Sequence, residues 1–417
     1  MSLFGKKAKP EESVRRPSLS PSIALERELA DKIYASLQGD VVNDVLSKLS
    51  DSGSDAWWKS KMEGHSLKVD PELLPDMWEL CSSVKKTLGF DEEVDFYITG
   101  DSTVNAFSVA AEKREEHHIV NINSALIDLM SEDELRFVVG HELGHLINRD
   151  TALSRLVMFV FPEGSKPPIT LQYKIRLHAQ LAELVADRYG FMAVGKLEPC
   201  VTAFFKMTSG LDLHKINVSI EALLKDNLKH LDYFLNDKGQ SHATHPVNPI
   251  RVQAINLFAT AGSQEELDGG LDQLISILLK VGNGEQDEQL ARFIASSGLL
   301  LSDSDGEVSK EEREMIIDNL GAIKVFPSAY LDEIEKGDVM EIFNDSVARI
   351  MQINPSLREG MMFYMTGVVM SDKRITRDEM EILMHYGRKI GYTDIEIANI
   401  VASAIQRSFI PSLDSIS

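Results

Sequence analysis

The sequence predicts a mainly α-helical protein that contains a small β-sheet and divides into two domains. Apolar residues recur every three or four positions along most of the chain, which is the period of amphipathic helices. Three short runs between residues 94 and 122 have instead the composition of β-strands. A chain of 417 residues is longer than one ordinary hydrophobic core requires, so two domains are expected.

The net charge of −22 argues against nucleic acid as a partner, because a polyanion would be repelled. More than half of this charge lies from residue 264 onward, and such asymmetry indicates a domain boundary. The acidic C-terminal part could offer a surface to a basic protein partner, or it could be a plain solvated face.

No apolar run reaches the length of about eighteen residues that a membrane span needs. The best candidate, 153–161, is about half that length and contains Arg155, so we expect a soluble protein without a transmembrane segment. The N-terminus lacks the apolar core of a secretory signal. Cys81 and Cys200 are the two cysteines, which fits a reducing cytoplasm and buried structural thiols.

The first 65 residues precede the segment that carries chemistry. Residues 1–21 are rich in Lys, Glu, Ser and Pro, and we expect a disordered tail. Residues 22–65 are expected to form N-terminal helices, since apolar residues recur at helical spacing over 22–49. The sequence assigns these helices no chemical role.

Residues 66–263 are expected to form the domain that carries the chemistry. A helix is predicted over 71–88, strands over 94–99, 104–110 and 118–122, and a short helix over 124–129. A small sheet beside a reactive site could pair an extended peptide along its edge strand. The sequence does not decide which strand is the edge.

The central motif is HELGH at 141–145, which lies in a predicted helix over about 132–149. Ser131 and Glu134 have the spacing of a capping box at the start of this helix. His145 follows His141 at i+4, so both imidazoles lie on one face and can bind one zinc ion. Glu142 points to a neighbouring face, where it can act as a base on a water molecule without occupying a coordination position.

A catalytic zinc site usually has three protein ligands, so a third must come from elsewhere. Our choice is Glu183, on a helix predicted to start near Leu171. Asp187 follows Glu183 at i+4 and could accept a hydrogen bond from a liganding histidine. His178 is the competing ligand on that helix, although it lies five residues from Glu183 and off that face. The HExxH pattern alone also occurs by chance.

The chain resembles the zinc metallopeptidases that include the CAAX prenyl endopeptidases and the HtpX heat-shock proteases. The resemblance covers about residues 66–260. It rests on Asn105-Ala106-Phe107, on 133–150 with HELGH at its centre, on 183–187, and on Thr244-His245-Pro246 with Arg251.

This resemblance implies a zincin-like domain with a gluzincin-type site and a metal-dependent endopeptidase activity on protein or peptide substrates. His141, His145 and Glu183 would hold one Zn²⁺ per chain, with Glu142 as the general base. By the same analogy Asn105 lines the cleft and His245 stabilises the oxyanion, although a turn histidine before Pro246 is the plainer interpretation. The best-known relatives carry membrane-spanning helices around this core, and this sequence departs from them there.

The remaining chain is expected to be a linker over 264–289 and an all-α domain over 290–410. Two segments, 298–312 and 367–379, repeat each other weakly as helix, acidic turn and helix. The first turn invites an EF-hand interpretation, but Leu301 would stand where calcium needs an oxygen ligand, so a helix-capping turn is the simpler alternative. The domain resembles the TerB-like helical domains of tellurite resistance, which suggests a metal-responsive or protein-interaction module.

Two functions from different classes remain at this stage. The first is a soluble cytoplasmic zinc endopeptidase with a helical accessory domain. The second is a latent or inactive zinc-binding scaffold that acts through its acidic domain in stress or metal response. A scaffold has no need of the base Glu142, so the intact motif favours the enzyme.

Overall fold

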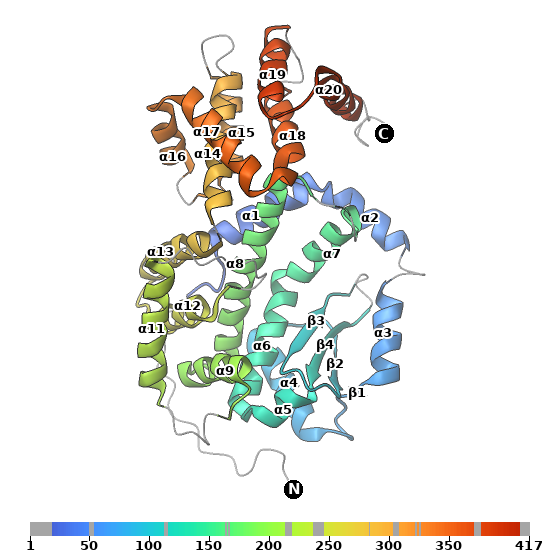
Figure 1. The fold of residues 1–417 in the computed structure, drawn as a ribbon. Helices are drawn as coiled ribbons and strands as arrows, with labels where there is room; N and C mark the ends of the chain where they lie inside the picture. Colours follow the sequence, from blue (N-terminus) through green and yellow to red (C-terminus); the bar gives the residue numbers. More distant parts are fainter. Residues whose placement is uncertain are drawn as a thin grey trace. The chain divides into compact units, whose positions relative to one another are not determined.

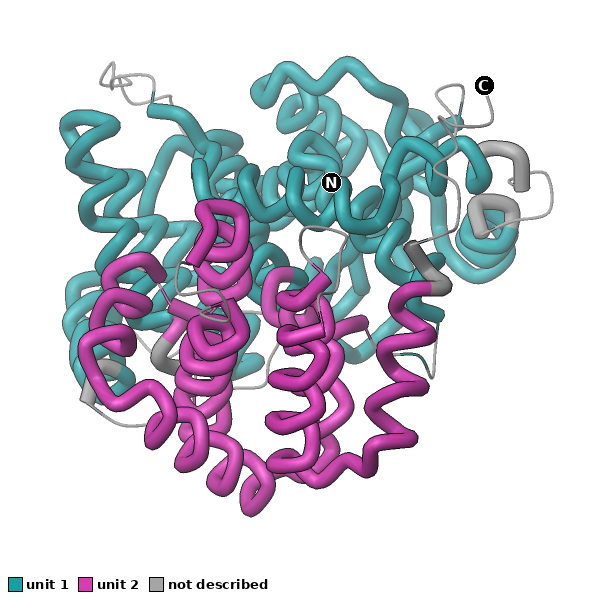
Figure 2. The backbone as a smooth tube through the Cα atoms, turned by 90° about the horizontal axis from the view of Figure 1, so that it is seen from above, with its two compact units in different colours: residues 1–165, 175–237, 241–278 teal, residues 166–174, 238–240, 279–417 magenta. Residues whose placement is uncertain are grey.

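The computed structural model describes residues 19–49, 54–111, 116–162, 165, 167–212, 219–236, 246–282, 284–302, 308–321, 323–324, 327–370 and 377–408. The chain separates into two compact units (Figure 2). Unit 1 consists of residues 1–165, 175–237 and 241–278, and unit 2 of residues 166–174, 238–240 and 279–417. The N-terminal helices and the HELGH segment both belong to unit 1.

Unit 1 contains a four-stranded sheet in the order β1-β2-β4-β3. β2 and β4 are parallel, and the outer strands β1 and β3 each run antiparallel to their neighbour. The three predicted strands are confirmed; the second, predicted over 104–110, is shorter in the structure, and the two-residue strand β1 was not predicted. The strands are β1 Leu67–Lys68, β2 Val94–Thr99, β3 Ala106–Val109 and β4 His118–Asn123.

Side chains on both faces of this sheet are buried, which explains why every residue of β4 is buried. Val120 and Ile122 point into the main core of unit 1, where they meet residues of α6. Ile119 belongs to a smaller cluster on the other face, with Met62 of α3 and Tyr97. Figure 1 shows α6 beside β3 and β4, and α3 beside β1 and β2. The sheet is therefore a middle layer between helices.

The helices of unit 1 largely follow the apolar periodicity of the sequence. α4 begins at Pro75, later than predicted, because proline is favoured in a first turn. Between α6 and the prolines at 162, 167 and 168 the chain forms another helix, α7. The helices are α1 Ala24–Ser36, α2 Gly39–Leu49, α3 Ser54–His65, α4 Pro75–Leu88, α5 Ser124–Leu129, α6 Glu132–Asn148, α7 Asp150–Val160, α8 Ile169–Val194, α9 Leu197–Ser209, α11 Ile220–Asn236, α12 Asn248–Thr260 and α13 Gln264–Gly282.

The segment 264–289 was expected to be a linker, and that expectation is wrong for most of its length. It holds α13 and the first turn of α14. Leu267, Leu271 and Leu274 are buried at helical spacing, and this apolar face stabilises a helix where the change in charge indicated a boundary. α8 and α13 each contain residues that are counted with unit 1 and residues that are counted with unit 2.

Within unit 1, helices α6 and α8 approach each other very closely. A methyl group added to Gly140 would lie 2.6 Å from Cβ of Ala193 and 3.0 Å from Cα of Gly190. A methyl group added to Gly190 would lie 2.7 Å from the carbonyl oxygen of Phe137. Side chains are therefore absent where the two backbones are nearest, and this is what lets polar groups on α8 reach α6.

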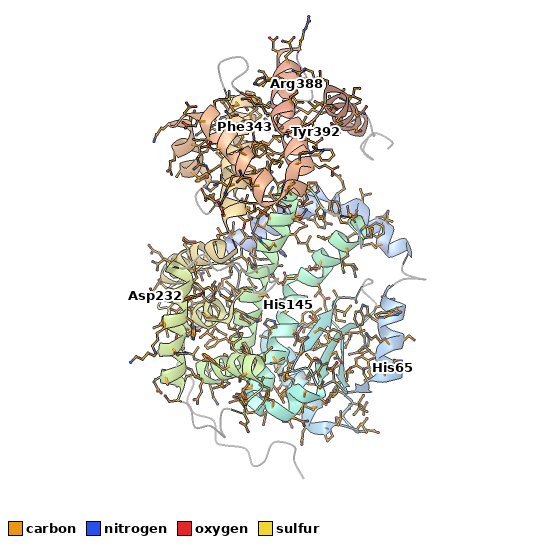
Figure 3. The ribbon with its side chains drawn as sticks, in the orientation of Figure 1. His65, His145, Asp232, Phe343, Arg388 and Tyr392 are labelled. Atoms are coloured by element: carbon orange, nitrogen blue, oxygen red, sulfur yellow. The ribbon has the colours of Figure 1, made fainter. Side chains whose placement is uncertain are left out.

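The regular secondary structure among the described residues of unit 2 is entirely helical. Its core surrounds α14, where Phe293 packs against Phe343 and Tyr364; Phe343 is labelled in Figure 3. The weak repeat corresponds to two helix pairs, α14 with α15 and α18 with α19. The elements are α14 Glu285–Ser302, α15 Lys310–Leu320, α16 Pro327–Glu335, α17 Val339–Ile353, the 3-10 helix η3 Pro355–Leu357, α18 Arg358–Val369, α19 Arg377–Lys389 and α20 Asp394–Ser408.

Several predictions fall on residues that the structure does not describe. One is the disordered tail, because residues 1–18 lie outside the described part of the chain. The others are the two acidic turns, at 303–307 and 371–376, and with them the calcium interpretation. Cys81 and Cys200 are confirmed as buried free thiols, and burial raises the pKa of Cys81 to about 12. Among the described residues, no helix combines the length and the apolar character that crossing a bilayer requires.

The close contact of α6 and α8 predicts the effect of adding one methyl group. Gly190→Ala should lower the free energy of unfolding of unit 1 by about 1–3 kcal/mol, because Phe137 and its backbone have to move. Gly64→Ala in α3 is the matched control, since nothing lies within 4 Å of the added methyl. All three tryptophans, Trp57, Trp58 and Trp78, belong to unit 1, so thermal unfolding followed by tryptophan fluorescence reports on this unit. Equal melting temperatures for the two variants would contradict the close contact.

Candidate metal centre and cleft

The first part of the site is the pair of histidines on α6. Ser131 caps this helix and accepts a hydrogen bond from the backbone of Glu134, whose carboxylate accepts one in return, so the predicted capping box is present. The Nε2 atoms of His141 and His145 lie 3.2 Å apart. His145 is labelled in Figure 3, in the interior of unit 1. The i, i+4 spacing thus brings both imidazoles to one point.

Glu183 of α8 faces these two nitrogen atoms. Its Oε2 atom is 3.7 Å from Nε2 of His141, and its Oε1 atom is 3.5 Å from Nε2 of His145. The three side chains form a cluster in which all the candidate ligand atoms lie within 4.8 Å of one another. The structure therefore brings together the three residues that the sequence selected as metal ligands.

Asp187, one turn after Glu183, lies behind His141. The Nδ1–H group of His141 donates to Oδ1 of Asp187 at 2.9 Å. Arg251 of α12 donates to both carboxylate oxygens of Asp187, at 2.9 and 2.7 Å, and its Nη2 atom is 3.2 Å from Glu183. Burial alone would raise the pKa of Asp187, but the charge and hydrogen bonds of Arg251, with those of His141, hold it below its ordinary value.

Asp150 lies behind His145 in the same way. The Nδ1–H group of His145 donates to Oδ2 of Asp150 at 3.1 Å. Arg149 makes this possible, because its left-handed backbone (φ 63°) ends α6 and begins α7, so the chain turns back toward the histidine. Burial alone would lower the pKa of His145, but Asp150, Glu183 and Glu142 hold that pKa well above its ordinary value.

These two carboxylates fix the imidazole rings. An ionised carboxylate only accepts hydrogen bonds, so each Nδ1 atom carries the proton. Each Nε2 atom of His141 and His145 would then offer its lone pair to a metal ion held beside the carboxylate of Glu183. Two imidazole nitrogens with one carboxylate oxygen are the donor set of catalytic zinc sites that keep an open position. The residues present therefore fit a zinc ion.

The cluster opens into a cavity of about 830 Å³ within unit 1. Glu142 lines this cavity beside the histidines and is only 7 % exposed. The cavity also follows β3 from Asn105 to Ala110. β3 is bonded to β4 along one side, and no other described strand pairs with its second side. Asn105 is exposed, and its backbone carbonyl oxygen accepts a hydrogen bond from the backbone N–H of Asn123.

Two predicted site residues stand apart from this cluster. His245 belongs to the segment 237–245, outside the described residues, so its role stays a prediction. His178, the competing ligand, is not part of the candidate ligand set. Its Nε2 atom donates to Oε1 of Glu26 at 2.8 Å. The spacing argument that placed His178 off the face of Glu183 agrees with this arrangement.

Sequence reasoning missed two polar residues near the histidines. Asp150 lies five positions after His145, and only the left-handed turn at Arg149 brings it back. Glu26 comes from α1, 122 residues before Asn148, whose side-chain amide donates to it at 3.2 Å. A charged residue within an otherwise apolar helical face, between Ile23 and Leu29, was the one available signal for Glu26.

Comparison with known proteins agrees with this geometry. Residues 77–163 match peptidase family M48. The M48 segment contains the HELGH helix and Asp150, whereas Glu183, Asp187 and Arg251 lie beyond it. The match supports a zinc metallopeptidase of this family.

Known relatives cover the chain in part. A plastoglobule-localized metallopeptidase 48 of Arabidopsis thaliana is 23% identical over 207 residues, which are 46% of this chain and 59% of that protein. A protease HtpX homolog of Gemmatimonas aurantiaca is 24% identical over 222 residues, or 46% of this chain and 78% of that protein. A protease HtpX homolog of Trichormus variabilis is 42% identical over 55 residues, which are 13% of this chain and 18% of that protein. No solved structure matches the chain significantly.

The contact between His141 and Asp187 predicts a loss of metal affinity. Asp187→Asn should weaken zinc binding by about 10–100-fold, because the histidine loses the charged acceptor that orients it. Competition with a chelator of known affinity measures this change. Asp133→Asn, a partly exposed acid at the start of α6, is the control and should bind zinc as the wild type does. An unchanged affinity in Asp187→Asn would show that the carboxylate does not orient the ligand.

Proposed function

We propose that this protein is a zinc-dependent endopeptidase that hydrolyses peptide bonds in protein substrates. The observation that carries the proposal is the convergence of His141, His145 and Glu183 on one point, with Glu142 in the same cavity. In this proposal the three residues hold one Zn²⁺ per chain. The M48 match supports the reaction class, and the relatives leave the substrate open.

Zinc, when bound, would polarise a peptide carbonyl and make a nearby water molecule more acidic. Glu142 is the group that moves the proton. Its carboxylate lines the cavity without joining the ligand cluster, so it can take a proton from the attacking water and deliver it to the leaving amine. Arg251 holds the pKa of Asp187 below its ordinary value and also lies 3.2 Å from Glu183, so one guanidinium faces both buried carboxylates.

The substrate would bind as an added strand along β3. This strand lines the cavity and is at the edge of the sheet, so its outer backbone groups can pair with an extended peptide. Asn105, just before β3, would then contact the peptide at the cleft. His245 would stabilise the oxyanion, as the family resemblance implies. We further propose that the acidic unit 2, with its resemblance to TerB-like domains, binds a protein partner, and that the protein acts in the cytoplasm.

Replacement of the base tests the reaction. Glu142→Gln should reduce cleavage of casein by at least about a hundredfold while zinc content stays at one per chain, because the ligands are intact. His145→Ala should lose the metal as well as the activity. Glu132→Gln, a partly exposed glutamate on the same helix that pairs with Arg136, is the matched control and should remain active.

Metal analysis and a substrate-trapping experiment distinguish the enzyme from the scaffold. Glu142→Gln should retain protein substrates that the wild type cleaves. Wild-type protein that is fully loaded with zinc, cleaves no peptide pool and yields no trapped substrate would favour the scaffold. Cleavage that persists in a metal-free Glu142→Gln protein would refute the proposed mechanism.

Strand addition at β3 predicts an alternating effect of backbone methylation. A strand presents every second N–H group to one neighbour, so methylating one alternate set of amides on a cleaved peptide should block pairing. We expect kcat/KM to fall at least about tenfold for that set, which corresponds to the loss of one or two hydrogen bonds. The other set, also kept away from the scissile bond, should be cleaved as the parent peptide is. Equal effects of both sets would exclude pairing along β3.

A further inference from the structure

A second group of buried polar residues lies behind His145. Glu26, Asp150 and His178 are 2 %, 7 % and 6 % exposed. The amide of Asn148 donates to Oε1 of Glu26 at 3.2 Å and to Oδ1 of Asp150 at 2.7 Å. His178 donates to the same oxygen of Glu26 at 2.8 Å, and its Nε2 atom is 4.0 Å from Asp150. Four side chains from α1, α6, α7 and α8 thus form one hydrogen-bonded group.

The two metal-binding histidines are supported differently. Behind His141, Asp187 is held by the guanidinium of Arg251 through two hydrogen bonds. Behind His145, Asp150 has no described arginine or lysine partner, and its second oxygen is held by Asn148. Asn148 in turn is held by Glu26. The orientation of Asp150 therefore depends on a residue of the N-terminal helix.

Helix α1 is fixed firmly enough to carry this role. Ile23, Leu29 and Ile33 on the same side of the helix are buried. Just before the helix, the carbonyl oxygens of Pro21 and Ser22 accept hydrogen bonds at 3.2 Å from Arg188. Arg188 follows Asp187 in sequence, so residues 21–33 contact the neighbours of both orienting carboxylates.

A second metal ion is the competing interpretation, because Glu26, Asp150 and His178 could each offer one ligand atom. The distances favour hydrogen bonds. Glu26 and His178 are at hydrogen-bond length, and the amide of Asn148 already donates to both carboxylates. A cation would have to displace these donors. Each of the three groups therefore already has a hydrogen-bond partner within the protein.

We propose that Glu26 is a positioning residue for the zinc site and that α1 serves as a clamp supplied by the chain itself. Glu26 holds Asn148, Asn148 holds Asp150, and Asp150 holds the imidazole of His145 with its Nε2 atom toward the cavity. The inference rests on the proposed zinc site and adds to it a requirement for the N-terminal helix. When Glu26 is lost, Asp150 can rotate and the zinc ligand is less well oriented.

Zinc release tests this clamp without relying on activity. Glu26→Ala should release zinc to an excess of chelator about 10–100-fold faster than the wild type. This is the factor by which metal affinity falls when the hydrogen-bond partner of a metal ligand is removed. Glu26→Gln keeps an oxygen that accepts from Asn148 and His178, so it should restore slow release. Glu28→Ala is the matched control, since Glu28 lies on the same helix, is 59% exposed and pairs with Lys32. All these proteins should bind one zinc per chain.

Asn148→Ala provides a second, independent break in the chain of contacts. It should speed zinc release as Glu26→Ala does. If circular dichroism shows that Glu26→Ala is unfolded, Asn148→Ala tests the proposal in its place. Release at the wild-type rate from folded Glu26→Ala or Asn148→Ala would overturn the clamp. A second zinc equivalent that Glu26→Ala loses would also overturn it, in favour of a metal site. A wild-type chain that binds no zinc would refute the proposed function and this inference together, whereas the other two outcomes leave that function intact.

Discussion

The contact between α6 and α8 is the constraint on which the site depends. A methyl group on Gly144, between the two histidines, would lie 3.0 Å from Cα of Ala186. The backbones are this close because both helices carry glycine or alanine at the contact. Glu183 lies about one turn before Ala186 and Asp187 directly after it, so both side chains reach His141 across this close contact. Core packing and ligand geometry are therefore one problem, and neither can change without the other.

The same contact has an electrostatic consequence. Glu142, Glu183 and Asp187 are each at most 7 % exposed, and burying three carboxylates so close together is costly unless positive charge is near. Arg251 provides one such charge from α12, at 2.7 Å from Asp187 and 3.2 Å from Glu183. One guanidinium does not balance three acids. A divalent cation between the histidines and Glu183 would complete the balance, which agrees with the donor set.

The sequence predicted the parts of this site that depend on local periodicity. The capping box at Ser131, the shared face of His141 and His145, and the i+4 relation of Glu183 to Asp187 all follow from helix geometry. Asp150 was missed because its position depends on the backbone of one residue, and no periodicity encodes a left-handed arginine. Glu26 was missed because its contacts are over a hundred residues away in sequence. Arg251 was singled out by the family resemblance alone, because nothing in the sequence of its own helix indicates which carboxylate it contacts.

The fold shows the same division. The other strands and most helices of unit 1 follow their apolar patterns. The outer strand β1 could not be predicted in this way, because two residues are too few to show a period. Helix α13 was mistaken for a linker, because the change in charge at residue 264 was given more weight than the leucines that follow it. Those leucines are buried, and tertiary packing tolerates the low helix propensity of Gly269 and Gly270. Local signals therefore gave the elements, while their boundaries and long-range partners required the structure.

The left-handed backbone of Arg149 links chain conformation to metal content. A side chain at positive φ costs roughly 1–2 kcal/mol relative to the ordinary helical region, and glycine would avoid that cost. The arginine holds the kink that presents Asp150 to His145. Any cation that binds only the oriented histidine contributes its binding free energy to this native conformation. The supply of zinc in the cell and the lifetime of the folded chain are then thermodynamically linked through one residue that touches no metal.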